Sequence, residues 1–347
     1  MTLHYIGADV DCKTTVLAVR RNGKVVAGYR VPTTIPALAE VLERIPDPKV
    51  MTAEEGPLAD WLWRNLRHRV QEFLVCDPRR NRLIVGDGDK DNRIDAEKLA
   101  ELYECRSLRP VHHPDSQERA DLKEWVSLYH DRVAEAVRQV NKLRARCRMH
   151  GRRPPAGFLR QEAARKKWLT ALERAQEGSL AGQLRVLLDS FDRARELVVR
   201  CRREMARRSR PYPIVEQWQA VPGVGPVRAI TLLAYLDTPW RFGSPQKRWK
   251  YCGIGLTRAT TGTNEQGRDK PGWLHVCLAC NHRLKAAVMG ATVSALAQGG
   301  NKFHEVYMRL LAKGVHAGNA RRAAARKLLD TLTGMWKNGS DYHPEMP

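Results

Sequence analysis

The chain has 347 residues, and 43% of them are hydrophobic, which is enough sequence for two or three domains with buried cores. Its 60 Lys and Arg residues against 38 Asp and Glu residues give a formal net charge of +22, an excess that favours nucleic acid as a partner over a merely solvated basic surface. The sequence has neither a secretory signal nor a run of roughly 18 apolar residues, so we exclude a membrane-spanning protein and expect a cytoplasmic one with no membrane partner.

Residues 1–112 alternate between strand-like and helical patterns. Residues 3–10 form an apolar run, and two further strand-like runs flank Asn22-Gly23, the commonest hairpin signal. The elements that follow are helical at 36–45, 58–66 and 95–104, and strand-like at 50–55 and 71–76. This alternation predicts an α/β domain in which helices cover a mixed sheet.

Residues 113–212 have the pattern of a second, helical domain. Residues 118–149 carry apolar side chains at intervals of three and four, which predicts one long amphipathic helix. The stretch GRRPPAG at 151–157 interrupts the pattern, and helical sequence then continues to residue 210. We therefore expect an antiparallel helical pair or coiled coil.

The end of this helical region is strongly basic, with eight arginines in residues 193–210. Such a helix face can lie along a phosphate backbone, and we take Arg200, Arg202 and Arg203 as candidate nucleic-acid contacts. A solvated helix face explains the same pattern equally well.

Residues 213–347 form the third predicted domain, which is mainly helical. Its segment 221–229, VPGVGPVRA, has the form of a helix–hairpin–helix turn, in which glycines let backbone amides approach a phosphate. Gly223, Gly225 and Arg228 are therefore candidate contacts to duplex DNA.

Acidic residues gather at three points of the first domain. They are Asp9 at the end of the first strand, Glu54 and Glu55 at the end of a later strand, and Asp87, Asp89, Asp91 and Asp95 around the start of a helix. Brought to neighbouring edges of one sheet, such carboxylates would suit Mg²⁺, and two magnesium ions can promote in-line phosphodiester displacement.

A purely structural role accounts for the same residues. Asp91 and Asn92 can cap a helix that begins near Ile94, and Glu54 or Glu55 can be a solvated strand end. The residues by themselves favour this alternative slightly.

Four segments, in this order, resemble the landmarks of the DEDD-type transposases, a family that includes Piv-type invertases and RNA-guided bridge recombinases. They are IGADV at 6–10, EEGP at 54–57, KDNRIDA at 90–96 and VPGVGPVRA at 221–229. Further similar segments at 241–256, 286–296 and 307–332 extend the resemblance over nearly the whole chain.

The resemblance implies an RNase H-like domain of the Holliday-junction resolvase type at 1–112, a coiled coil at 113–212 and a C-terminal transposase domain at 213–347. Members of the family excise and insert their element, and some are guided by a structured RNA that pairs with both DNAs. The resemblance therefore implies DNA and a guide RNA as partners, Mg²⁺ as cofactor, and a homodimer or homotetramer.

Carried over by position, the resemblance assigns metal ligands to Asp9, to Glu54 with Glu55 as the alternative, and to Asp95. The third acidic position of the family is Asn92 here, and an amide oxygen brings no charge to a metal. Asp91 is adjacent, but its side chain would point about 100° away on a helix.

The nucleophilic serine of the family corresponds to Thr261, within Thr260-Thr261-Gly262. The hypothesis is a transposase in which Asp9, Glu54, Asp95 and Asn92 hold magnesium while Thr261 attacks a DNA phosphate. The alternatives are a junction-resolving nuclease that uses only the carboxylates and water, or a catalytically impaired nucleic-acid-binding derivative.

Overall fold

The computed structural model of the chain describes residues 2–78, 91–114, 116–259, 273–276 and 279–344. They fall into two compact units, Met1–His113 and Pro114–Pro347. Within these residues, none of the helices is both long and apolar enough to cross a bilayer. The three domains expected from the sequence stay a prediction.

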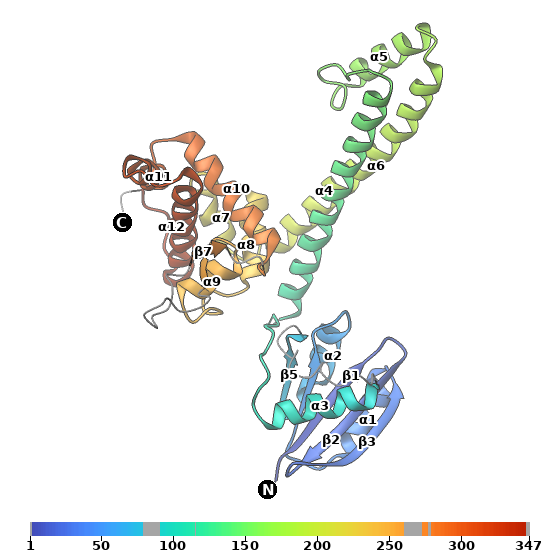
Figure 1. The fold of residues 1–347 in the computed structure, drawn as a ribbon, viewed down its shortest axis with the longest axis vertical. Helices are drawn as coiled ribbons and strands as arrows, with labels where there is room; N and C mark the ends of the chain where they lie inside the picture. The colour runs from blue at the N-terminus through green and yellow to red at the C-terminus, as the bar shows by residue number, and fades with distance from the viewer. Residues whose placement is uncertain (1, 79–90, 115, 260–272, 277–278, 345–347) are drawn as a thin grey trace, which may run out of the picture. The chain divides into compact units, whose positions relative to one another are not determined.

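The first unit is built on a mixed five-stranded sheet with the order β3-β2-β1-β4-β5 (Figure 1). Its strands are β1 (His4–Val10), β2 (Thr14–Arg21), β3 (Lys24–Pro32), β4 (Lys49–Glu54) and β5 (Glu72–Cys76). β1, β2 and β3 pair antiparallel, whereas β4 runs parallel to both β1 and β5. The predicted mixed sheet is confirmed.

The hairpin between β2 and β3 turns at Asn22 and Gly23, both of which have positive φ angles, 52° and 75°. Two successive positive φ angles are what a tight turn between twisted strands requires, and Asn-Gly adopts them at low cost. The hairpin predicted from this dipeptide is confirmed.

Helices cover both faces of the sheet. They are α1 (Ile35–Arg44), α2 (Ala59–Leu66) with the short 3₁₀ turn η1 (Arg67–Arg69), and α3 (Asn92–Glu104). Alternate strand residues pack against α1 and α2 on one face, including Ile6, Ala8 and Met51. The intervening residues face α3, because Val50 packs with Leu99 of that helix.

The backbone of α3 lies directly against β1 at Gly7. A Cβ atom on Gly7 would stand 2.1 Å from the carbonyl oxygen of Ala96 and 2.5 Å from the amide nitrogen of Ala100. No side chain fits at these distances, so glycine is required for this close approach. The contact fixes the first turns of α3 over the middle of β1.

The second unit begins with two long helices, α4 (Gln117–Met149) and α6 (Gly178–Ser209), with α5 (Glu162–Arg174) between them in sequence. α4 and α6 lie side by side and run antiparallel (Figure 1). Leu122 near the start of α4 shares a buried cluster with Met205 near the end of α6. At the other end, Leu143 packs with Leu180. The predicted long helix and its antiparallel partner are confirmed.

Eight further elements lie in the described part of this unit, and the two short strands among them pair antiparallel. They are α7 (Ile214–Gln219), α8 (Pro226–Leu236), α9 (Pro245–Tyr251), β6 (Leu256–Ala259), β7 (Trp273–Val276), α10 (His282–Gln298), α11 (Lys302–Ala312) and α12 (Ala317–Asn338). The predicted, mainly helical character is confirmed, and the small hairpin is an addition to it.

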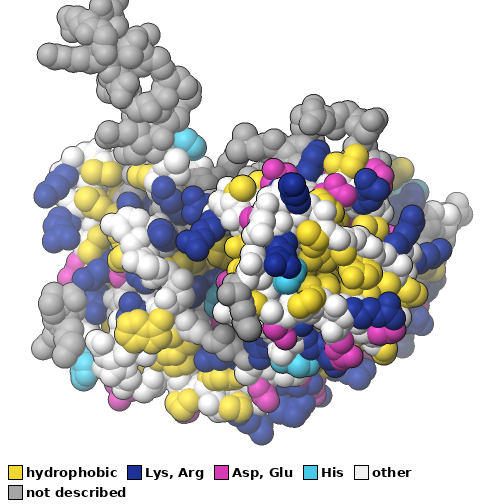
Figure 2. Space-filling view, turned by 90° about the horizontal axis from the view of Figure 1, so that it is seen from below, with side chains coloured by type: hydrophobic (Ala, Val, Ile, Leu, Met, Phe, Trp, Pro, Cys, Tyr) yellow, Lys and Arg dark blue, Asp and Glu magenta, His cyan; other side chains and the backbone are white. Residues whose placement is uncertain are grey.

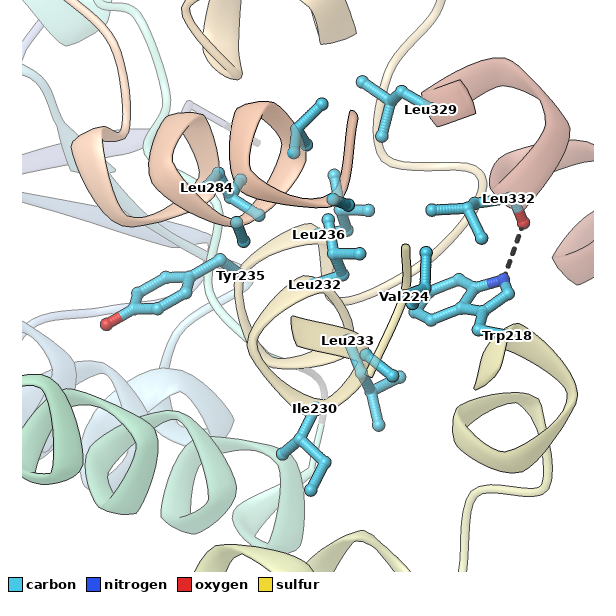
Figure 3. Packing of buried hydrophobic residues seen from close by; sticks show 14 of the residues in the cluster. Trp218, Val224, Ile230, Leu232, Leu233, Tyr235, Leu236, Leu284, Leu329 and Leu332 are labelled. Carbon is cyan, nitrogen blue, oxygen red and sulfur yellow. Dashed lines mark hydrogen bonds between the residues drawn. The ribbon is translucent and has the colours of Figure 1, made fainter. Parts of the chain in front are cut away.

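The core of this region surrounds α8, whose residues from Ala229 to Leu236 are all buried. A helix that is apolar on every side belongs at the centre of a core. Figure 3 shows Leu232, Leu233 and Leu236 of α8 among side chains of neighbouring helices. The indole Nε1 of Trp218 donates a hydrogen bond of 2.9 Å to the carbonyl oxygen of Leu332, which ties α7 to α12.

Polar contacts join the first half of α4 to this same core. Arg283 of α10 donates to the carboxylate of Asp131 at 2.7 Å, and His130 Nε2 lies 3.1 Å from the hydroxyl of Thr231 in α8. Arg119 pairs with the buried Asp237 at 3.2 Å. The base of the helical pair is therefore part of the packing of the C-terminal helices.

Candidate functional site

Asp9 lies near the end of β1 on the face that carries α3. Ile6 and Ala8 point into the core beneath α1 and α2, so alternation along the strand directs Gly7 and Asp9 to the opposite face. The Asp9 side chain is half-buried there. The sheet thus holds the backbone of this carboxylate rigidly while one side of it remains open.

Glu54 lies beside Asp9 on the neighbouring parallel strand. In the register of β1 and β4, Gly7 pairs with Thr52 and Ala8 with Ala53, so Asp9 and Glu54 are next in line. Met51 and Ala53 belong to the core under α1 and α2, which places Glu54 on the α3 face.

Glu55 comes after the end of β4, in a bend where strand alternation no longer fixes the direction of a side chain. Its backbone N–H donates a hydrogen bond of 2.9 Å to the carbonyl oxygen of Cys76 in β5. Of the two glutamates that the sequence left open, this geometry favours Glu54.

Asp95 approaches the same region from α3. It lies in the first turn of the helix and is exposed, and it directly precedes Ala96, whose carbonyl packs on Gly7 of β1. The close contact between helix and strand therefore brings this third carboxylate toward Asp9, two residues after Gly7.

The pKa of the Asp9 carboxyl is affected by the two neighbouring carboxylates. Burial is the largest cause of the raised pKa of the Asp9 carboxyl, and the charges of Asp95 and Glu54 raise the pKa further. A smaller contribution to the same pKa comes from Asp11, which the sequence patterns did not single out. Its position two residues after Asp9 in GADVD is the signal that could have identified it.

The residues around the helix start have different surroundings. Asp91 is the N-cap of α3, and its carboxylate accepts a hydrogen bond of 3.1 Å from the backbone N–H of Arg93. Capping by Asp91 is confirmed, whereas the expected start near Ile94 is wrong, because the cap lets the helix begin at Asn92. Asn92 is exposed and lies three residues before Asp95, about one turn away.

The donor set fits a hard divalent cation in its chemistry. Asp9, Glu54 and Asp95 supply carboxylate oxygens, and a cation between them would relieve the repulsion that raises the pKa of Asp9. No three His, Cys, Asp or Glu side chains among the described residues are already spaced as a complete ligand set. Binding would therefore require the carboxylates to close on the ion.

Thr261, the candidate nucleophile, lies outside the described residues, as do Thr260, Asp87 and Asp89. Residues 260–272 connect β6 to β7, which pair from Ala259 opposite Trp273 to Leu256 opposite Val276.

The predicted DNA-binding hairpin lies between α7 and α8. Gly223 has a φ angle of 81°, and a Cβ atom there would stand 2.1 Å from the carbonyl oxygen of Ala291 in α10. Arg228 donates to the carbonyl oxygen of Gly223 at 2.7 Å and to the hydroxyl of Ser294 at 2.9 Å. Gly223 and Arg228 thus have packing roles, while Gly225 has open space around it and caps α8.

The candidate arginines of α6, Arg200, Arg202 and Arg203, are all exposed. Arg207 near the end of the same helix pairs with Glu204 at 3.0 Å instead. Figure 2 shows that Lys and Arg side chains are spread over much of the visible face, with Asp and Glu side chains between them. At the three candidate positions, α6 presents guanidinium groups to solvent.

Two family models match the chain. A model of the DEDD transposases of IS110, described as "Transposase", matches residues 6–147, and one described as "Transposase IS116/IS110/IS902 family" matches residues 216–307. The first match contains Asp9, Glu54 and Asp95, and the second contains the hairpin and Thr261. No curated protein matches the chain.

The raised pKa of Asp9 predicts a pH-dependent gain in stability for Asp9→Asn. A raised pKa means that the ionised carboxyl opposes folding above that pKa, and that this penalty vanishes below the unfolded value of about 4. In metal-free buffer at pH 7 the variant should unfold at a temperature higher by up to about 3 °C, since the side chain is only half-buried. The gain should disappear near pH 4.

With Mg²⁺ present, the unmodified protein should unfold at a higher temperature than Asp9→Asn. Mg²⁺ should raise the unfolding temperature of the unmodified protein and of Asp341→Asn, an exposed carboxylate of the second unit, but not that of Asp9→Asn. An unfolding temperature of the unmodified protein that does not respond to Mg²⁺ would contradict a metal site at Asp9.

Proposed function

This chain belongs to the IS110 family of DEDD-type transposases, enzymes that cut and rejoin DNA, and we propose that it acts on the ends of an insertion sequence and on target DNA. The observation that carries the proposal is the convergence of Asp9, Glu54 and Asp95 on the α3 face of the sheet. A half-buried carboxylate whose pKa is raised by burial and then by the charges of Asp95 and Glu54 is costly for folding, and such sites are often functional.

In this proposal Asp9, Glu54 and Asp95 bind Mg²⁺. When bound, the ion stabilises negative charge on a phosphate oxygen and favours ionisation of an attacking hydroxyl. Asp9 is held by the sheet, and Asp95 is held by the contact of α3 with Gly7, so the protein fixes two ligands from different elements. Glu54 lies at the end of β4, and its side chain is exposed.

Asn92 is proposed as a fourth, neutral ligand or as a residue next to the ion. It lies about one helical turn before Asp95, and its amide oxygen can coordinate magnesium without adding negative charge. Three carboxylates leave the site one charge short of the family pattern, so we expect weaker metal binding than in relatives with an aspartate here. Asp91 is already used as the helix cap.

Thr261 is proposed as the nucleophile. As its Oγ1 forms a bond to the phosphorus of a DNA phosphodiester, the hydroxyl proton is lost and the bond from phosphorus to the leaving DNA oxygen breaks, with that oxygen taking up a proton. Attack by a DNA hydroxyl on the resulting phosphothreonine reverses the step and rejoins a strand.

The remaining architecture is proposed by analogy with the family. The sheet order with helices on both faces supports an RNase H-like fold for residues 1–112. The apolar seam between α4 and α6 supports a coiled coil within residues 113–212. The α7–hairpin–α8 segment supports a helix–hairpin–helix element in the transposase domain at 213–347.

Thr261 and the carboxylates lie in separate matched segments, and catalysis requires them to meet. We propose that they meet between subunits of a homodimer or homotetramer that acts in the cytoplasm. A molar mass in solution that corresponds to one protein chain per DNA complex would contradict this arrangement.

Thr261→Ala should abolish a covalent protein–DNA adduct. The unmodified protein, incubated with Mg²⁺ and DNA that carries the ends of its element, should form an adduct that survives denaturing electrophoresis and disappears on protease treatment. Thr260→Ala, the neighbouring hydroxyl, is the matched control and should retain the adduct. Adduct formation by Thr261→Ala would refute the assignment.

The same experiment separates the alternatives. Strand cleavage without any adduct favours a junction-resolving nuclease that uses only the carboxylates and water. DNA binding with neither cleavage nor adduct favours a catalytically impaired derivative, for which Asn92 in place of an aspartate is the supporting observation.

A structured guide RNA is the further partner that we propose, supported by the exposed arginines of α6. When the chain is expressed together with its flanking genomic DNA, sequencing of the co-purified RNA should yield one dominant structured species. Replacement of Arg200, Arg202 and Arg203 together by Gln should lower its yield at least about tenfold, because several phosphate contacts are lost. A heterogeneous RNA mixture would contradict the guided mechanism.

A further inference from the structure

Trp240 is an exposed tryptophan in the second unit. It lies in the loop between α8 and α9 and retains 69% of its accessible surface. The other tryptophan side chains whose burial the structure describes are buried or half-buried. Tryptophan is highly buried on average, because a large aromatic ring gains much from leaving water. An indole left in solvent therefore offers a large apolar surface to a partner.

The backbone on both sides of Trp240 is held in place. On one side, Asp237 ends α8 with a φ angle of 66° and is buried. On the other side, the guanidinium of Arg241 donates a hydrogen bond of 2.7 Å to the carbonyl oxygen of Tyr235 and lies 4.5 Å from the ring centroid of Tyr251. A ring carried on backbone that is already fixed loses less conformational freedom when a ligand binds.

Lys337, near the end of α12, covers part of one face of the indole. Its ammonium nitrogen lies 4.7 Å from the ring centroid of Trp240, which is a cation–π contact. A ring whose opposite face were also covered could not keep 69% of its surface accessible. The opposite face is therefore open, and another flat ring can stack on it.

The segment that carries the indole is positively charged. Residues 240–251 contain four Lys and Arg residues and no Asp or Glu. Lys247, Lys250 and Lys337 are exposed, and no ion pair joins any of them to a carboxylate within the described residues. Asp237, a short distance before Trp240 in sequence, is already paired with Arg119 at 3.2 Å. An excess of positive charge of this kind attracts a polyanion.

The open ring and the positive charge together indicate the class of ligand. An apolar peptide would match the ring but not the cations. A paired duplex would match the cations but not the ring, because its bases are stacked inside the helix. An unpaired nucleotide offers a flat base to the ring and a phosphate to the cations, and aromatic rings among cations are a common binding surface for single strands.

We propose that Trp240 is a stacking site for an unpaired base of a nucleic-acid strand, with Lys337 supporting the other face of the indole. Stacking tolerates any sequence, because every base has a flat π-face. The inference rests on the proposed function, since a transposase handles cut DNA strands and its proposed guide RNA has unpaired loops. It adds a base contact to a chain whose proposed contacts on α6 are to phosphates.

The first test is equilibrium binding of the full-length protein, measured by fluorescence anisotropy. The probes are a single-stranded DNA, a single-stranded RNA of the same sequence and a long, fully paired duplex. Trp240→Ala should weaken binding to at least one single strand about tenfold, because one stacked base is lost, and should leave duplex binding unchanged. The slope of log K against log salt concentration should stay the same, because no phosphate contact is removed. Trp240→Phe should retain most of the affinity.

Met149→Ala is the matched control, because Met149 is a similarly exposed apolar side chain at the end of α4. Its affinities should equal those of the unmodified protein, and unfolding temperatures should confirm that all the variants fold. A loss that Trp240→Ala shows with the DNA strand alone, or with the RNA strand alone, supports the site and identifies the strand that it holds.

Photochemical cross-linking locates the contact directly. On irradiation, strands in which 5-iodouracil replaces thymine or uracil react with aromatic side chains that stack on the modified base. Mass spectrometry of the digested protein should find the strand attached to the peptide that contains Trp240. Attachment to other peptides but not to this one would overturn the proposal.

Unchanged affinity of Trp240→Ala for both single strands, with an unmodified protein that binds them, would overturn the stacking site and leave the proposed function intact. An equal loss of affinity for the duplex would also overturn it, because paired bases cannot stack on the indole. The same conclusion would follow from an unmodified protein that binds the duplex but neither single strand. A protein that binds no nucleic acid would contradict both proposals.

Discussion

The contact of α3 with β1 at Gly7 is the constraint on which the candidate active site depends. Backbone atoms of Ala96 and Ala100 lie where a side chain at residue 7 would have to be, so helix and strand approach as closely as two backbones can. This contact fixes the distance between Asp9 on the strand and Asp95 on the helix. The sheet fixes Glu54 beside Asp9 through the parallel register of β1 and β4.

Placing these carboxylates close together opposes folding electrostatically, and the rest of the chain carries an excess of the opposite charge. Three carboxylates gather on one face of the first unit, and burial together with the charges of Asp95 and Glu54 raises the pKa of Asp9. Elsewhere the surface is strongly basic, as expected for a net charge of +22. A metal cation bound at the carboxylates would offset their negative charge, and nucleic-acid phosphates would offset the positive charge of the basic surfaces. Both are expected of a metal-dependent enzyme that acts on nucleic acid.

Much of the fold could be predicted because it depends on local periodicity and turn chemistry. The hairpin at Asn22-Gly23 and the long helix Gln117–Met149 are examples. Features that depend on tertiary packing could not be predicted. The choice between Glu54 and Glu55 needs the face of β4, and the requirement for glycine at residue 7 needs the position of α3. The internal role of Arg228 likewise depends on α10, which is distant in sequence.

The central claim is that Asp9, Glu54 and Asp95 form one divalent-cation site on the α3 face, and binding of Mn²⁺ in place of Mg²⁺ tests it independently of catalysis. The free ion can be quantified by electron paramagnetic resonance in titrations of the unmodified protein, Glu54→Gln and Glu55→Gln. We predict that Glu54→Gln weakens Mn²⁺ binding by at least about tenfold, whereas Glu55→Gln leaves it unchanged. Equal binding by all three proteins, or a loss confined to Glu55→Gln, would contradict the claim.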